Sequence, residues 1–122
     1  MKTFRFATIN INIQFQEQRL PLLEKAFEHS KADFIAVQEV YELDKFQSMI
    51  RNAGYPHNVF NSFIDVKGRE NFVGVISKSP LVELNDSRMH HGNICFAGAT
   101  LEKTFINLAS AHFTWGSHSE LQ

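Results

Sequence analysis

The chain has 122 residues, enough for one domain at most, and 43% of them are hydrophobic, which is sufficient for a packed core. Twelve Lys and Arg residues against 13 Asp and Glu residues give a net charge of −1, which argues against a strongly basic protein that wraps nucleic acid. Cys95 is the single cysteine, so no internal disulfide forms, and no stretch reads as a signal peptide or reaches the roughly 18 apolar residues of a membrane span. We therefore expect a soluble, intracellular protein.

The N-terminal part of the chain predicts a βαβ unit followed by a second helix. A β-rich segment at residues 3–13 and a continuous apolar run at residues 33–39 indicate two strands, separated by an amphipathic helix at about residues 18–29. The crossover in such a unit is right-handed in nearly all proteins, so the two strands are expected to be parallel. A further helix is predicted at about residues 42–53, with Gly54 as its C-cap.

The rest of the chain predicts strands joined by short polar connections. These strands are expected at about residues 55–63, 72–77, 94–101 and 104–112. A tight turn at Glu102 and Lys103 joins the last two. Ser117 and Glu120 have the spacing of a capping box, which predicts that a helix begins there and that the chain is the N-terminal piece of a larger fold. A frayed tail is the alternative.

Polar residues stand where the two parallel strands are predicted to end. Asn10 and Asn12 share one face near the end of the first strand, and Glu39 ends the second. All three should lie at one edge of the sheet, where open α/β sheets bind ligands. A carboxylate beside an amide oxygen is a half-site for Mg²⁺, so Glu39 and Asn10 are candidate ligands. A solvated turn or a helix cap is the other interpretation of Glu39.

Four further residues are candidates for contact with a substrate. His112 follows an apolar strand and either makes a structural hydrogen bond or donates to a phosphate oxygen. Arg69 and Asn71 belong to a polar turn around Gly68, which is either a solvated loop or a contact for a substrate phosphate. Trp115 either packs against the next helix or stacks on a base or lipid group.

Four segments of the chain carry a wider pattern: T-x-N-x-N at residues 8–12, A-D-F-I-A-V-Q-E-V at 32–40, F-V-G-V-I-S-K-S-P-L at 72–81 and N-L-A-S-A-H-F at 107–113. In this order they resemble the endonuclease/exonuclease/phosphatase superfamily, which includes DNase I-like nucleases, abasic-site endonucleases, tyrosyl-DNA phosphodiesterases, neutral sphingomyelinases and inositol-polyphosphate phosphatases. The resemblance implies an α/β fold in which a βαβ start leads into a mixed sheet flanked by helices. Residues 1–122 would form a single, incomplete domain, the first half of a DNase I-like two-sheet sandwich, supplying roughly its first sheet.

The resemblance also implies roles for the strand-end residues. Glu39 matches the family's metal-binding glutamate and Asn10 its active-site asparagine. Asn12 matches the polar position two residues on, a possible contact to the metal or a water, and His112 matches a position beside the scissile phosphate. The implied cofactor is Mg²⁺, with Mn²⁺ as a possible substitute, and the implied reaction is metal-assisted attack of water on phosphorus.

Departures from the family pattern limit the implied activity. Ile9 replaces a frequent aromatic residue, and neither a G-D-x-N segment nor a C-terminal Asp/Ser-His pair is present. The chain is therefore expected to be the N-terminal half of a phosphodiesterase, nuclease or phosphatase, inactive without the other half. Its substrate would be nucleic acid, phospholipid or inositol phosphate, which the sequence does not distinguish.

Two other functions are compatible with the residues. In the first, the half-fold is a non-catalytic binding or assembly module, which pairs with itself or a partner through the apolar face meant for the second sheet. In the second, it is a nucleic-acid-binding domain that uses Arg69 and Trp115, which the near-neutral charge disfavours.

Overall fold

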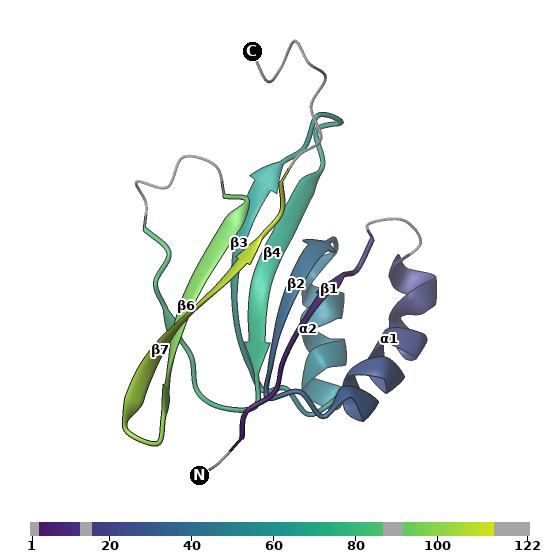
Figure 1. Ribbon diagram of the computed structural model, residues 1–122. Helices are drawn as coiled ribbons and strands as arrows, with labels where there is room; N and C mark the ends of the chain where they lie inside the picture. The colour runs from purple at the N-terminus through teal and green to yellow at the C-terminus, as the bar shows by residue number, and fades with distance from the viewer. Residues whose placement is uncertain (1–2, 13–15, 87–91, 114–122) are drawn as a thin grey trace.

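Two helices and seven strands follow one another in the computed structural model, which describes residues 3–12, 16–86 and 92–113 (Figure 1). The helices are α1 (Gln16–Ser30) and α2 (Leu43–Asn52). The strands are β1 (Phe6–Asn10), β2 (Phe34–Val40), β3 (His57–Ile64), β4 (Glu70–Ser77), β5 (Val82–Glu83), β6 (Ile94–Leu101) and β7 (Thr104–Ala111). No helix within these described ranges is long and apolar enough to cross a membrane.

The strands form two sheets. The first sheet has the order β1-β2-β4-β3, with β1 and β2 parallel and the other pairs antiparallel. This arrangement confirms the predicted βαβ unit and the mixed sheet. Short β5 joins β6 and β7 in a second, antiparallel sheet. The chain is expected from its sequence to supply roughly the first sheet, and it also supplies this second sheet, because the β6–β7 hairpin lies against the face of the first sheet and does not extend its edge.

The helices cover one face of the first sheet. Ile35 and Val37 of β2 point to this side and are fully or almost fully buried among residues of both helices. Phe46 of α2 is fully buried and makes edge-to-face contacts with Phe27 of α1 and Phe60 of β3, with ring centroids 6.1 and 6.2 Å apart. Large aromatic and branched side chains therefore fill this layer, which we call the helix-side layer.

Small side chains fill the layer between the two sheets. Alternation along β6 places Cys95, Ala97 and Ala99 on one face, all buried. Cys95 and Ala97 pack with Val73 and Val75 of β4 in what we call the sheet–sheet layer. Cys95 is fully buried in this layer, and burial raises the pKa of its thiol to about 11.

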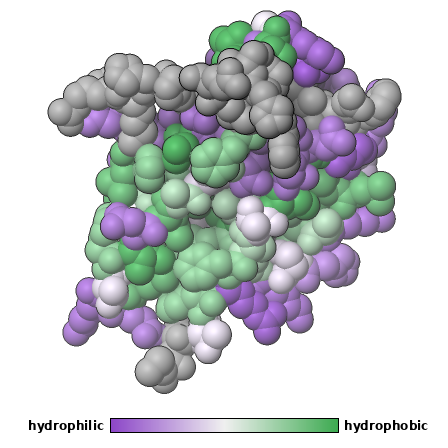
Figure 2. All heavy atoms as spheres, turned by 45° about the horizontal axis from the view of Figure 1, so that its top comes forward, coloured by the Kyte–Doolittle hydropathy of each residue, from purple (hydrophilic) through white to green (hydrophobic). Residues whose placement is uncertain are grey.

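One side of the molecule is left without a covering layer. β1 ends the strand order of the first sheet and β7 that of the second. Phe6 of β1 and Phe105 of β7 are 56% and 51% exposed. Figure 2 shows a broad hydrophobic area that is bordered by hydrophilic residues. We call the free edges of β1 and β7, with Phe6 and Phe105, the open side.

The structure places the surface for association between chains differently from the sequence-based expectation. The sequence predicts association through a bare face of the first sheet. That face is covered by the chain's own second sheet, in which β6 contacts β3 and β4 and β7 contacts β4 and β2. Exposed apolar side chains at β1 and β7 include Phe6 and Phe105.

Candidate active site

The candidate site is built around an irregularity at the end of β2. The pairing of β2 with β4 shifts register between Val37 and Val40, and Glu39 within this bulge has a left-handed backbone with φ of 57°. Such a φ is uncommon for a residue with a side chain and is often found where the surrounding structure enforces it. The bulge breaks the alternation of the strand and lets the Glu39 side chain reach the end of the second sheet.

His112 meets Glu39 from that second sheet. Its Nε2 atom lies 3.4 Å from Oε1 of Glu39, and the two side chains are 20% and 27% exposed. The His112 ring stacks on Phe63 with centroids 5.6 Å apart, and its backbone exchanges two hydrogen bonds with Asn93. The buried Nδ1 atom has no hydrogen-bond partner among the described residues. Packing on several sides therefore directs Nε2 toward the carboxylate.

Asn10 lies beside this pair, as the sequence predicts. Asn10 is the last residue of β1 and pairs with Gln38 of β2. Gln38 immediately precedes Glu39 in the chain. The side-chain oxygen of Asn10 accepts a hydrogen bond of 2.9 Å from the backbone N–H of Asn12, which has φ of 65°. The structure thus brings Asn10, Asn12, Glu39 and His112 to one edge of the molecule.

A hydrogen-bond network ties the two sheets together next to the site. The amide nitrogen of Gln38 donates to the hydroxyl oxygens of Ser110 and Thr8, at 2.9 and 3.2 Å. Ser110, which is 1% exposed, donates in turn to the carbonyl oxygen of Val37 at 2.8 Å. Sequence reasoning missed Ser110. Its signal is a polar residue at an inward position of a strand, two residues before His112.

The turn between β3 and β4 uses the polar residues that were candidates for substrate contact. Both oxygens of Asp65 accept hydrogen bonds, from the backbone N–H groups of Lys67 and Arg69, from Nε of Arg69 at 3.1 Å and from the amide of Asn71 at 2.8 Å. These hydrogen bonds hold the pKa of Asp65 below its usual value, and the bond from the Arg69 backbone N–H has the largest effect. Arg69 and Asn71 therefore stabilise the turn. Trp115 lies outside the described residues.

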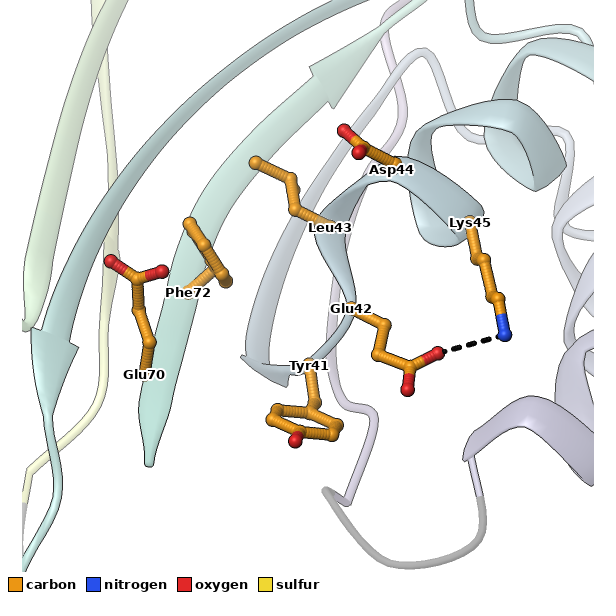
Figure 3. A pocket seen from close by; sticks show the side chains of 7 residues that line it. All are labelled: Tyr41, Glu42, Leu43, Asp44, Lys45, Glu70 and Phe72. Atoms are coloured by element: carbon orange, nitrogen blue, oxygen red, sulfur yellow. Dashed lines mark ion pairs between the residues drawn. The ribbon is translucent and has the colours of Figure 1, made fainter. Parts of the chain in front are cut away.

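A pocket of about 570 Å³ opens between the start of α2 and the start of β4 (Figure 3). Residues at the start of α2 and the start of β4 line it: Tyr41, Glu42, Leu43, Asp44, Lys45, Glu70 and Phe72. Lys45 pairs with Glu17 at 2.8 Å and with Glu42 at 3.1 Å, and these contacts raise its pKa above the usual value. Neither Glu39 nor His112 lines this pocket, so it is separate from the strand-end site.

The oxygen atoms at the strand ends suit a hard cation. Within the described residues, no three His, Cys, Asp or Glu side chains gather as a metal cluster. Glu39 and Asn10 offer one carboxylate and one amide oxygen at neighbouring strand ends. Mg²⁺ binds through one or two carboxylates and keeps several waters, so this donor set fits Mg²⁺ better than zinc, which takes nitrogen and sulfur ligands.

Comparison with known proteins gives no match to a family model and none to a curated protein sequence. Solved structures do match. An endonuclease/exonuclease/phosphatase family protein from Leptotrichia buccalis C-1013-b aligns with a TM-score of 0.67 and 15% identity, over 92% of this chain and 55% of its own. A humanized D. rerio TDP2 aligns with a TM-score of 0.70 and 15% identity, over 97% of this chain and 50% of its own. The fold is that of the endonuclease/exonuclease/phosphatase proteins.

An AP endonuclease from Archaeoglobus fulgidus shares the same fold, with a TM-score of 0.53 and 19% identity over 86% of this chain and 40% of its own. This chain therefore spans about half of the length of these endonuclease/exonuclease/phosphatase structures. The fold class predicted from the sequence, half of a DNase I-like sandwich, is confirmed.

Proposed function

We propose that the chain is one half of a metal-dependent phosphoester hydrolase, with its site at the ends of β1, β2 and β7. The observation that supports this most is the 3.4 Å contact between Glu39 and His112, which two different sheets bring together beside Asn10. The half-fold is shared with proteins named as endonucleases and phosphatases, which adds to the proposal. Nucleic acid, phospholipid and inositol phosphate are all candidate substrates.

Some of the site residues would bind the metal, and His112 would contact the substrate. Glu39 and Asn10 would hold Mg²⁺, or Mn²⁺ in its place, with Asn12 near the metal or a bound water. A bound divalent cation neutralises charge on the phosphoryl oxygens and lowers the pKa of a coordinated water. His112, held by its stacking on Phe63, would donate from Nε2 to a non-bridging oxygen as negative charge develops there. Arg69, Asn71 and Trp115 stay predictions as substrate contacts.

Activity would need a second half of the fold. The described residues at the strand ends provide one carboxylate and one imidazole, and no further general base lies with them. The free edges of β1 and β7 and the exposed Phe6 provide a surface on which another polypeptide half can add strands. We propose that the 122-residue polypeptide is inactive alone and associates through the open side.

A metal titration tests the first part of this proposal. Mg²⁺ binding followed by calorimetry, and Mn²⁺ binding followed by electron paramagnetic resonance, are expected to weaken at least about tenfold in Glu39→Gln, because one charged oxygen ligand is lost. Glu42→Gln, which removes a carboxylate three residues away that pairs with Lys45, is the matched control and should bind normally. Equal binding in both variants, or none in the unsubstituted chain, would favour the non-catalytic assembly module.

Activity and association are measured on the same polypeptide. Hydrolysis of bis(p-nitrophenyl) phosphate with Mg²⁺ is expected to stay at background. Turnover that disappears in Glu39→Ala would contradict the need for a second half. Light scattering should show association that rises with concentration and weakens in Phe6→Ser, and a monomer at all concentrations would contradict association through the open side.

A further inference from the structure

Three consecutive carbonyl groups at the bulge of β2 are each satisfied by a different element. The oxygen of Val37 accepts from the Ser110 hydroxyl of β7, and the oxygen of Gln38 accepts from the backbone N–H of Ile11 at 2.9 Å. The oxygen of Glu39 accepts from the side-chain amide of Gln16, the first residue of α1. A bulge normally leaves its extra residue unpaired, so these donors account for the shape of this one.

Gln16 makes more of these contacts than its place in the helix requires. Its amide nitrogen also donates to the carbonyl oxygen of Asn12 at 2.9 Å, and its amide oxygen accepts from the backbone N–H of Tyr41 at 2.9 Å. Both N–H donors and the oxygen of the side chain are therefore used, and the residue is 6% exposed. None of these partners belongs to α1, so Gln16 is not acting as a cap of its own helix.

The partners of Gln16 are the two left-handed positions of the candidate site. Asn12 and Glu39 have φ of 65° and 57°, and Gln16 accepts from Tyr41 two residues beyond Glu39. One buried side chain thus joins the end of β1 to both sides of the Glu39 backbone. Backbone in this region persists only where surrounding contacts over-determine it. At Asn12, Gln16 shares this task with Arg19, which donates to the same carbonyl oxygen at 3.1 Å, whereas at Glu39 the side-chain contact to the carbonyl oxygen comes from Gln16.

We infer that Gln16 is a positioning residue of the site, which fixes the Glu39 backbone in its left-handed conformation and sets the spacing between the ends of β1 and β2. This inference rests on the proposed function only in so far as Glu39 is a metal ligand. The chemistry of a glutamine suits the task, because no other side chain offers two N–H donors and an acceptor at this length, asparagine being one carbon shorter.

Two substitutions test the inference. Gln16→Met keeps the size of the side chain and removes every polar contact, whereas Gln16→Glu keeps the acceptor for Tyr41 and loses both donors. In either variant, the three-bond HN–Hα coupling and the Cα chemical shift of Glu39 are expected to move toward extended-strand values. Mg²⁺ affinity is expected to fall about tenfold or more, the usual effect of losing a group that orients a ligand.

Two controls separate positioning from general stability. Gln18→Met changes the same residue type at an exposed position of α1 and should alter neither signal. Leu23→Ala removes a buried side chain of α1, so it should lower the melting temperature while leaving the Glu39 coupling and the Mg²⁺ affinity unchanged.

The outcomes distinguish this inference from the proposed function. Unchanged Glu39 signals in a folded Gln16 variant overturn the inference, whatever the metal result, and the second variant serves if the first does not fold. If the Glu39 signals move but the unsubstituted chain binds no Mg²⁺, the positioning contact stands and the proposed function fails.

Discussion

The two apolar layers on either side of the first sheet differ in what they are made of. The helix-side layer contains large, fully buried side chains such as Phe46 and Tyr55. The buried side chains of the sheet–sheet layer are smaller: they are Val59, Val73, Val75, Cys95 and Ala97. Buried apolar area is the main source of stability, so the helix-side layer should contribute most of it. The candidate site lies at the end of the sheet–sheet layer, where Ser110 lies on β7 and His112 directly follows that strand.

This difference separates the residues that keep the chain folded from those that complete the site. Glu39 belongs to β2, which the helix-side layer covers, whereas His112 is held by the second sheet. The contact between them depends on both layers. Substitutions in the helix-side layer should therefore cost more stability than substitutions on the outer face of the second sheet, and the first two of three predictions test this.

The largest effect is expected in the helix-side layer. Phe46→Ala removes a fully buried ring with two aromatic neighbours and should lower the free energy of unfolding by about 3–5 kcal/mol. Phe105→Ala, on the outer face of β7 and 51% exposed, should change it by less than about 1 kcal/mol. Urea denaturation of both variants measures the comparison. Equal losses would mean that the outer face of the second sheet is covered in solution.

A second, smaller effect is expected at two glycines, where an added Cβ atom would come almost equally close to an aromatic ring. A Cβ atom added at Gly74 would lie 2.3 Å from the Phe60 ring and 2.8 Å from the carbonyl oxygen of Val59, and one added at Gly98 would lie 2.2 Å from the Phe105 ring. Gly74→Ala should cost about 1–3 kcal/mol, because packed atoms and backbone must shift. Gly98→Ala should cost less than about 1 kcal/mol, because the exposed ring can turn away. Denaturation midpoints that fall equally in both variants would contradict this.

The smallest effect concerns how the stability of the chain depends on pH through Asp65, in the turn that joins β3 to β4. The pKa of Asp65 is lower in the folded chain than its ordinary value of 3.8, so the unfolded chain binds more protons in acid. The contribution of this carboxylate is complete above pH 3.8 and is lost as the pH falls through the lower, folded value. Wild-type stability should therefore fall more steeply with acid than that of Asp65→Asn. Parallel pH profiles of the two proteins in denaturation experiments would show that the turn contributes nothing.

Much of the fold follows from local sequence patterns. The βαβ unit and the β6–β7 hairpin are predicted because apolar periodicity and a turn at Glu102 and Lys103 define them, and both of these turn residues have positive φ. The parallel pairing of β1 and β2 in this unit then places Asn10 opposite Gln38, at the end of β2. Alternation alone does not say whether a hairpin joins the edge of a sheet or covers its face, so the sequence predicts the β6–β7 strands but not that they form a separate sheet.

The details of the site depend on contacts between distant segments. Gln16 looks like an ordinary helix residue until the carbonyl of Glu39 lies beside it. Likewise, nothing near Arg69 in the sequence distinguishes a phosphate contact from its actual ion pair with Asp65, because both use the same guanidinium. The distance between Glu39 and His112 follows from the bulge in β2, which has no reliable sequence signal.

The network between β7 and β2 also bears on the order in which the molecule folds. Ser110 and Val37, which it joins, are 73 residues apart in the chain. Contacts this distant form late, because the chain between them must lose its freedom first. β1, α1 and β2 need only a short loop between neighbours. We therefore expect the N-terminal unit that carries Glu39 to fold early. The contact between Glu39 and His112 would form late, when β7 pairs with β6 and packs on the first sheet.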